Sequence, residues 1–210
     1  MAKRTPPYSI QALLRFDKYV TDEICRFADR FAAVRSFKRQ CKTLEYSCHG
    51  ILWLCAWMIF IWFAWTPSLF QMQVNFLIAL ILDIIYVGIL KAIFRRRRPA
   101  GNKPDALEIS VDKFSFPSGH VSRAVFILYF FLYLYPINLI FIPPLLAWCV
   151  SVSVSRILLR RHHLLDVLGG VVLGLFEGFV MNYLWLSAGS AFYIIEWITD
   201  EKFDGGEYHV

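Results

Sequence analysis

Charged residues are scarce in this chain of 210 residues, which sets it apart from soluble globular proteins. Asp, Glu, Lys and Arg supply only 18% of the residues, whereas 58% are hydrophobic and the mean hydropathy is +0.50. A soluble domain has about a quarter charged residues. The composition therefore argues against a soluble enzyme and favours an integral membrane protein, and the length leaves room for one domain.

Cysteine is also sparse, with five residues, an odd number that shows no metal-ligand spacing. A disulfide framework and a zinc site are therefore not expected, and neither is any cofactor. Cys41 and Cys48 lie near an apolar run, so acylation is an alternative to their interpretation as free thiols. The first residues lack a short apolar core followed by a small-residue cleavage site, so we expect no cleaved signal peptide.

Apolar runs predict an all-α fold, a polytopic membrane helix bundle of about five spans. The runs cover approximately residues 51–65, 74–94, 121–135, 143–155 and 164–186. A helix needs about 20 residues to cross a hydrocarbon core of ~30 Å, so the shorter runs need help from flanking residues. Gly169, Gly170, Gly174 and Gly178 in the last run would allow a neighbouring helix to approach closely.

The first part of the chain has a different pattern. Apolar residues from Ile10 to Val34 recur at helical spacing, with Lys and Arg between them, which is too charged to cross a bilayer. Such a helix can lie flat on the membrane or pack on the bundle, and the pattern favours neither. The predicted organisation is a cytosolic amphipathic segment at 1–48, a membrane domain at 49–187 and an acidic tail at 188–210.

The distribution of charge predicts how the bundle is oriented. Residues 1–50 carry ten Lys and Arg against five Asp and Glu, the 91–113 loop carries seven against three, and residues 156–161 carry three against none. The connections at 66–73 and 136–142 carry no charge. The positive-inside rule then places the N-terminus and the basic loops in the cytosol. Because the basic residues flank apolar runs, a membrane or phosphate partner explains the net charge of +6 better than nucleic acid does.

Residues 155–166 are the most unusual stretch, because three arginines, two histidines and one carboxylate lie at the edge of an apolar run. Ionisable groups are costly in that position and indicate a functional site. His162 and Asp166 are four residues apart, so on a helix the carboxylate can hold the imidazole. Arg156 adds a permanent positive charge. The combination predicts chemistry on an anion, and a phosphate is the simplest choice.

Two further polar islands fall on the same face of the predicted membrane, one from Lys91 to Pro99 and one from Pro117 to His120. Hydrolysis of a phosphate ester needs a nucleophile, a proton for the leaving oxygen, and positive charge around the other oxygens. His162 can attack phosphorus, and His120 can protonate the leaving group. The candidate phosphate-binding groups are Lys91, Arg98, Arg156, the Ser118 hydroxyl and the amides at the start of the helix after Pro117.

In order and spacing, the three islands resemble the motifs of the type 2 phosphatidic acid phosphatase (PAP2) superfamily, which are lipid phosphatases related to vanadium haloperoxidases. Those motifs read Lys, six residues, Arg-Pro; then Pro-Ser-Gly-His; then Ser-Arg, five residues, His, three residues, Asp, and all are present here between residues 91 and 166. The resemblance covers roughly residues 75–187. It implies a metal-independent site in which His162 forms a phosphohistidine, Asp166 supports it and His120 is the general acid. The implied phosphate-binding residues are Lys91, Arg98, Ser118, Gly119 and Arg156.

Within the superfamily, residues 95–100 and 110–120 resemble the polyisoprenoid diphosphate phosphatase branch. That resemblance implies presqualene, farnesyl and geranylgeranyl diphosphates as substrates. It also implies a place in the endoplasmic reticulum and nuclear envelope, and the charge pattern puts the active site on the cytosolic face. The sequence does not predict the oligomeric state.

Alternative functions stay open. One is a phosphatidate, lysophosphatidate or sphingoid-phosphate phosphatase of the same superfamily. Another is a catalytically silent membrane scaffold, which the intact His120, His162 and Asp166 disfavour. A transporter is disfavoured because the ionisable residues cluster at one face instead of following a path across the membrane.

The remaining polar residues receive a structural interpretation. Asp83 and Glu177 lie inside apolar runs, and pairing within the bundle is favoured over a direct function for both. Basic residues beside a span are usually a solvated flank that sets topology. This interpretation is given to Arg95, Arg96, Arg97, Arg160 and Arg161, and His163 is interpreted as a neighbour without a role.

Overall fold

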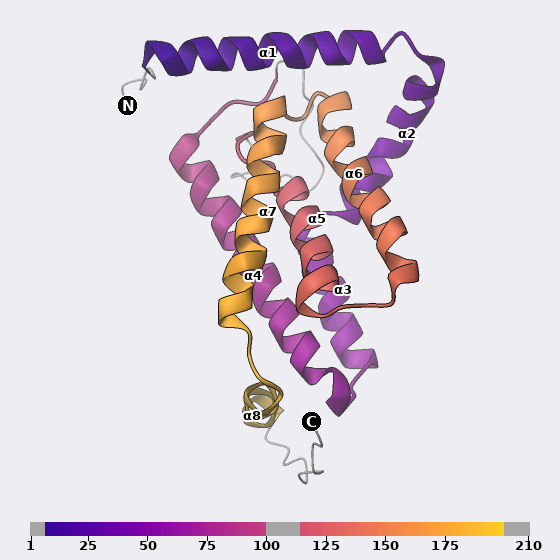
Figure 1. Ribbon diagram of the computed structural model, residues 1–210, viewed down its shortest axis with the longest axis vertical. Helices are drawn as coiled ribbons and strands as arrows, with labels where there is room; N and C mark the ends of the chain where they lie inside the picture. The colour runs from indigo at the N-terminus through magenta and orange to yellow at the C-terminus, as the bar shows by residue number, and fades with distance from the viewer. Residues whose placement is uncertain (1–6, 100–113, 200–210) are drawn as a thin grey trace.

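The computed structural model describes residues 7–99 and 114–199, which form a helix bundle with one helix lying across each end (Figure 1). The helices are α1 Tyr8–Ala28, α2 Ala32–Ser47, α3 Gly50–Phe63, α4 Phe70–Phe94, α5 Gly119–Tyr129, α6 Ile142–Leu158, α7 Leu164–Leu184 and α8 Ala188–Thr199. Short helical turns η1 Pro67–Leu69, η3 Phe130–Leu134 and η4 Leu139–Phe141 adjoin α4, α5 and α6. Since these two ranges contain no strand, the all-α prediction is confirmed.

Three helical segments are long and apolar enough to cross a membrane, at residues 67–94, 139–158 and 164–184. Two shorter apolar helices occupy residues 50–63 and 119–134. Large apolar side chains such as Trp62, Phe63 and Val172 point outward, as a lipid-facing surface requires. The membrane bundle is confirmed, while the number of complete spans, about five, stays a prediction.

Two buried apolar clusters hold the bundle together, and α5 belongs to both. Phe76 of α4 packs against Phe126 and Phe130 in the first cluster, with ring centroids 6.1 and 4.8 Å from its own. The second cluster joins α5 to α6 and α7 through side chains that include Val125, Val152 and Val167. The start of α5, which carries the Pro-Ser-Gly-His island, is therefore fixed by neighbours on several sides.

Glycines bring α7 unusually close to α5. A Cβ atom on Gly170 would stand only 2.7 Å from the carbonyl oxygen of Ser118, and one on Gly174 would collide with that of Ser122. Small residues allow helix backbones to approach in this way. The predicted role of the glycines is confirmed here, and its result is that the starts of α5 and α7 lie together, with the Ser118 amide donating to the Asp166 carbonyl oxygen at 3.0 Å.

Helix α1 lies across the end of the bundle where α7 begins (Figure 1). Asp17, Thr21 and Cys25 recur every four residues along it and are buried. The adjacent face exposes apolar side chains, among them Phe16 and Phe27, which are 64% and 61% exposed. The amphipathic helix therefore packs on the bundle through this buried stripe, which is one of the two arrangements that the pattern left open.

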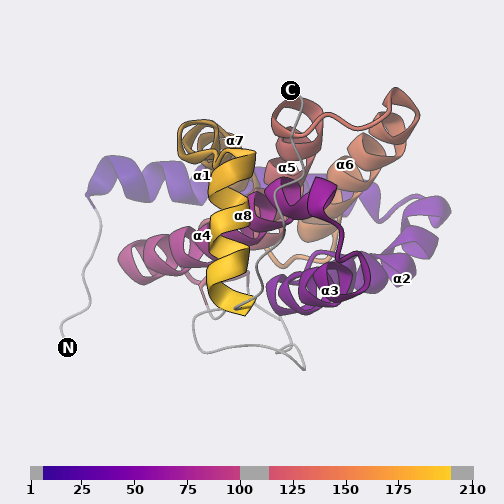
Figure 2. The same ribbon diagram turned by 90° about the horizontal axis from the view of Figure 1, so that it is seen from below.

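At the opposite end, α8 appears end-on in Figure 1 and lengthwise in Figure 2, so it also lies across the bundle. Phe192 of α8 packs on Phe70 of α4 with ring centroids 5.2 Å apart. The sequence analysis assigned residues 188–210 to an acidic tail and predicted no helix there, so α8 corrects it. Residues 200–210, which hold most of the acids, lie outside the described residues.

Candidate active site

The three polar islands meet beneath α1. Each predicted site residue comes from the end of a helix or from the connection next to it. His162, between α6 and α7, has Asp166, Arg98, Lys91 and Arg156 as its charged neighbours. His120 in turn has Arg156, His162 and Lys91 among its own. The predicted residues that the structure brings together are Lys91, Arg98, Ser118, Gly119, His120, Arg156, His162 and Asp166.

His162 is 3% exposed and is oriented by the main chain. Its Nδ1 atom lies 2.8 Å from the carbonyl oxygen of Ser115, but 3.9 Å from Oδ2 of Asp166. A carbonyl oxygen only accepts, so Nδ1 carries the proton and the neutral ring presents an unprotonated Nε2. The expected tautomer is present, but Ser115 makes the direct hydrogen bond that the sequence analysis gave to Asp166. A main-chain carbonyl leaves no signal in a sequence motif, which is why Ser115 was missed.

The surroundings of His162 also keep it neutral. Burial lowers the pKa of His162 well below its usual value, Arg98, Lys91 and Arg156 lower it further, and Asp166 opposes them. The neutral imidazole is the form that can attack phosphorus.

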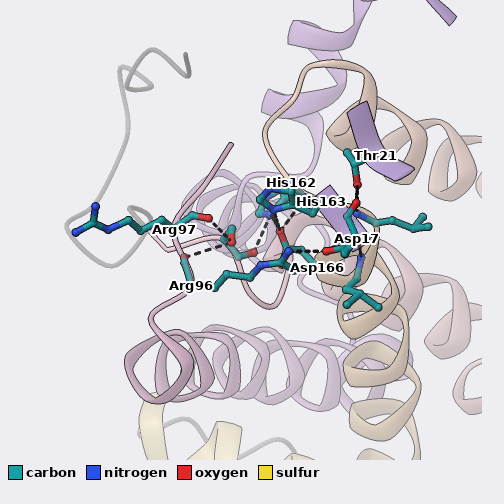
Figure 3. Close-up of polar contacts among 10 residues, drawn as sticks. Asp17, Thr21, Arg96, Arg97, His162, His163 and Asp166 are labelled. Atoms are coloured by element: carbon teal, nitrogen blue, oxygen red, sulfur yellow. Dashed lines mark hydrogen bonds and ion pairs between the residues drawn. The ribbon is translucent and has the colours of Figure 1, made fainter. Parts of the chain in front are cut away.

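Asp166 is fully buried, and both of its oxygens accept hydrogen bonds (Figure 3). Oδ1 accepts from Nη1 of Arg96 at 2.7 Å. Oδ2 accepts from the backbone amide of His163 at 2.8 Å and lies 3.2 Å from its Nδ1. These contacts form a capping box at the start of α7. His163 therefore has a structural role, holding the carboxylate that lies between the two histidines.

Arg96 corrects the interpretation of the arginine run as a solvated flank. Its guanidinium is 13% exposed and pairs with Asp166 through Nη1 and with Asp17 of α1 through Nη2. Arg97 points away from this group in Figure 3, and Arg95 is exposed, so the flank interpretation fits those two. The sequence could not separate Arg96 from Arg95 and Arg97, because its partner Asp17 lies 79 residues away.

A second missed contact comes from α2. Oε1 of Glu45 lies 2.9 Å from Nη1 of Arg156 and 3.6 Å from Nε of Arg161, so Arg161 is also more than a flank. The main-chain carbonyl oxygen of Glu45 lies 3.2 Å from Nε2 of His120. One residue of the amphipathic segment therefore touches both a predicted phosphate-binding group and the predicted general acid. Its only sequence signal is an isolated acid in a basic stretch.

Two donors in the site are left for a ligand. The Ser118 hydroxyl and Nη2 of Arg156 are buried and have no hydrogen-bond partner within the described part of the chain. Such donors are costly unless something binds them, and phosphate oxygens accept from both. Ser118 is also the N-cap of α5, whose first amides favour an anion at the same place. With Lys91 only 4% exposed beside them, the arrangement suits a tetrahedral anion.

The model of the PAP2 superfamily matches residues 72–189, more than half of the chain and all of the predicted site residues. The chain belongs to the PAP2 superfamily. A curated relative, the probable lipid phosphate phosphatase beta of Arabidopsis thaliana, is 36% identical in an alignment 149 residues long, which covers 58% of this chain and 70% of the relative. No solved structure matches the chain. The resemblance seen in the motifs is confirmed for the superfamily, and these matches do not decide the branch.

The PAP2 bundle carries a second group of charges deeper inside. Nη2 of Arg123 pairs with Oδ2 of Asp83, and its Nη1 donates to the carbonyl oxygen of Cys48 at 2.8 Å. Glu177 of α7 is buried beside Asp83 and Arg123. The predicted pairing is confirmed for Asp83, whereas the carboxylate oxygens of Glu177 have no hydrogen-bond partner among the described residues. Asp83, Arg123 and Glu177 are called the bilayer cluster below.

The cysteines near the PAP2 site are buried thiols. Cys41 and Cys48 are both 0% exposed, and the thiol of Cys48 donates to the carbonyl oxygen of His120 at 3.1 Å. Burial raises the pKa of Cys41, and it raises that of Cys48 to about 12. The structure therefore fits their interpretation as free thiols and offers no access for acylation.

Proposed function

We propose that this protein removes phosphate from polyisoprenoid diphosphates and related lipid phosphates through a phosphohistidine at His162, without a metal ion. Its membership of the PAP2 superfamily makes it a lipid phosphatase. The observation that carries the mechanism is the buried position of His162, whose Nδ1 is held by the Ser115 carbonyl at 2.8 Å while Lys91, Arg98 and Arg156 surround it.

In the first step, the lone pair on Nε2 of His162 attacks phosphorus. A P–N bond forms, the bond from phosphorus to the leaving oxygen breaks, and that oxygen takes a proton from His120, which enters this step as the imidazolium and leaves it neutral. The cationic groups Lys91, Arg98 and Arg156, with the Ser118 hydroxyl and the Gly119 amide, stabilise the charge on the other three oxygens. Nε2 of His120 lies 3.2 Å from the Glu45 carbonyl oxygen, which only accepts, so Nε2 is the nitrogen that carries the transferable proton.

In the second step, water attacks the phosphohistidine. His120, now neutral, accepts the proton of the water, the P–N bond breaks, and the lone pair returns to Nε2 of His162 as phosphate leaves. His162 is cationic while it carries the phosphoryl group. Asp166, whose Oδ2 lies 3.9 Å from Nδ1, stabilises that charge.

The preference for diphosphates is supported by the number of cations at the site. A diphosphate carries more negative charge than a monoester and gains more from each additional guanidinium. The sequence of residues 95–100 and 110–120 supports the same branch, although residues 100–113 lie outside the described residues. A phosphatidate or sphingoid-phosphate phosphatase fits the superfamily equally well. We also propose the endoplasmic reticulum and nuclear envelope as its location.

Phosphate release by the purified protein tests this proposal. With a chelator present, we expect faster release from presqualene and farnesyl diphosphates than from phosphatidate or sphingosine phosphate. His162→Ala should abolish both phosphate release and the acid-labile phosphoprotein that a phosphohistidine at His162 produces. Arg26→Gln, an exposed change on α1, should preserve both. Activity that survives His162→Ala overturns the role of His162. A preference for phosphatidate overturns the branch and leaves the mechanism standing, and no release from any lipid favours the silent scaffold.

Sidedness needs a separate measurement. The excess of Lys and Arg in residues 1–50 supports a cytosolic position for the α1 end of the bundle, and thus for the site. A glycosylation-site reporter in the 100–110 loop should remain unmodified. Modification of that reporter would refute the cytosolic placement.

A further inference from the structure

We propose that Asp17 of α1 is a positioning residue for His162 and Asp166, so that the amphipathic segment before the family match completes the active site. This inference rests on the function proposed above. It goes beyond the three motifs, because Asp17 lies 55 residues before the start of the family match at residue 72.

The first observation is that α1 caps the start of α7. The amide of Leu164 donates to Oγ1 of Thr21 at 3.0 Å, and the amide of Leu165 donates to Oδ1 of Asp17 at 3.0 Å. The next two amides of α7 bond to the carbonyl oxygen of His163. The first four amides of a helix have no partner within it. Since another helix supplies two of these four partners, α1 holds the segment that joins His162 to Asp166.

The second observation is an ion-pair chain from α1 to Asp166. The guanidinium of Arg96 lies between two carboxylates, pairing with Oδ2 of Asp17 and, at 2.7 Å, with Oδ1 of Asp166 (Figure 3). Asp17 is 4% exposed and Asp166 is 0% exposed. With the bonds from Leu165 and His163, all four carboxylate oxygens accept a hydrogen bond. Asp17, Arg96 and Asp166 are called the rim cluster below.

The rim cluster determines how much of the negative charge of Asp166 remains available to stabilise His162. The groups that face His162 are Lys91 of α4, Arg98 after it, His120 of α5, Arg156 of α6 and Asp166 of α7. Asp166 is the only acid in this set, and it also balances Arg96. The carboxylate of Asp17 neutralises part of the positive charge of Arg96. If the charge of Asp17 is removed, Arg96 is balanced by Asp166 alone, and His162 loses part of the charge that stabilises its cationic phosphorylated form.

Asp17→Asn tests this charge with little change of shape, because Oδ1 of the asparagine can still accept from the Leu165 amide. We expect kcat to fall about 10- to 100-fold, as for outer-shell partners of other functional histidines, with KM within about twofold. An anion near an imidazole raises its pKa, so losing Asp17 should move the acid limb of kcat/KM to lower pH. A purely structural defect lowers the amount of folded enzyme and leaves the limb in place.

Two changes on the same helix are controls. Asp22→Asn removes an exposed partner of Arg160, 3.2 Å away, and should leave kcat and the acid limb unchanged. Thr21→Val removes the other α7 cap, so it should lower the thermal stability without moving the limb. In an Arg96→Gln background, Asp17→Asn should add little, since the two residues act in series. This background also provides the test if Asp17→Asn alone does not fold, because Arg96→Gln should itself lower kcat.

The inference is overturned if Asp17→Asn keeps the wild-type kcat and acid limb. It is also overturned if lost activity matches lost folded protein while the limb stays in place, or if Arg96→Gln is fully active. Failure of the proposed function looks different, because then the wild-type protein itself releases no phosphate from the lipid panel.

Discussion

The rim cluster and the bilayer cluster are built from the same parts and differ in how completely their hydrogen bonds are made. Each has one arginine and two acids, and α7 supplies an acid to both, Asp166 and Glu177, eleven residues apart. In the rim cluster every carboxylate oxygen accepts a hydrogen bond. In the bilayer cluster, Oδ1 of Asp83, both oxygens of Glu177 and Nε of Arg123 have no partner within the described ranges.

This difference separates two uses of a buried charge. A fully bonded network has one geometry and holds its members rigid, which is what catalysis by fixed charges requires. A partly bonded network still joins helices, but fewer hydrogen bonds fix the positions of its atoms. In the rim cluster, Arg96 binds Asp166, which lies beside the predicted nucleophile His162. The bilayer cluster joins α4, α5 and α7 within the bundle. Burial of charge alone therefore does not identify a site.

The largest effect should come from the acid that the rim cluster holds. Asp166→Asn keeps an oxygen for Arg96 but removes the charge near His162, so we expect kcat to fall on the order of 10³-fold or more, by analogy with other histidine-orienting carboxylates. Single-turnover phosphate release from a lipid diphosphate measures this. If kcat of the correctly folded Asp166→Asn protein falls by less than tenfold, Ser115 alone orients His162.

The bilayer cluster should respond in stability. Arg123→Met leaves the buried Asp83 without its cation, and loss of one partner of a buried pair costs about 3–5 kcal/mol. We expect a marked fall in the unfolding midpoint of the detergent-solubilised protein. Asp83→Leu and Glu177→Met added to Arg123→Met should recover most of it, because replacing the whole group is often neutral. A stable Arg123→Met protein without activity would instead make this cluster part of the catalytic machinery.

A smaller effect is expected on the pH dependence, where removing a cation of the site should act in the direction opposite to removing an anion. Arg98 lowers the pKa of His162, so Arg98→Gln should raise it and move the acid limb of kcat/KM to higher pH. That is opposite to the direction expected for Asp17→Asn. Initial rates across the acidic range, at substrate levels far below KM, measure both variants. Shifts in the same direction would show that charge near His162 does not control the limb.

The smallest effect should come from Glu177. Its oxygens have no hydrogen bond to lose within the described residues, and glutamine has the same shape. We expect Glu177→Gln to change the free energy of unfolding by less than about 1 kcal/mol and kcat by less than about twofold. Thermal unfolding and phosphate release measure the two quantities. A large loss of activity would show that the two clusters do not differ in function.

The apolar runs and the motif residues could be predicted because their signals are local. About 20 apolar residues in sequence are enough to indicate a span, and the short separation of His162 and Asp166 predicted that they lie near each other. The predicted helix does not include His162, which lies just before the start of α7. The contacts of Arg96 and Glu45 could not be predicted, since both depend on partners from distant segments. Ser115 acts through its main chain, which no residue type reveals. Helix α8 was missed because the acids that follow it dominate the composition of that segment.

The contacts of α1 and α2 bear on what can be exchanged among members of the superfamily. Similarity begins at residue 72, and composition divides the chain near residue 48, yet Asp17 and Glu45 contact the site from before both boundaries. A portion cut at either boundary and grafted elsewhere would keep every motif residue. It would also remove the Glu45 partner of Arg156 and leave Arg96 paired with Asp166 alone. From the proposed role of Asp17, we expect the smallest transferable unit with full activity to include α1 and α2, and so to be longer than the family match at residues 72–189.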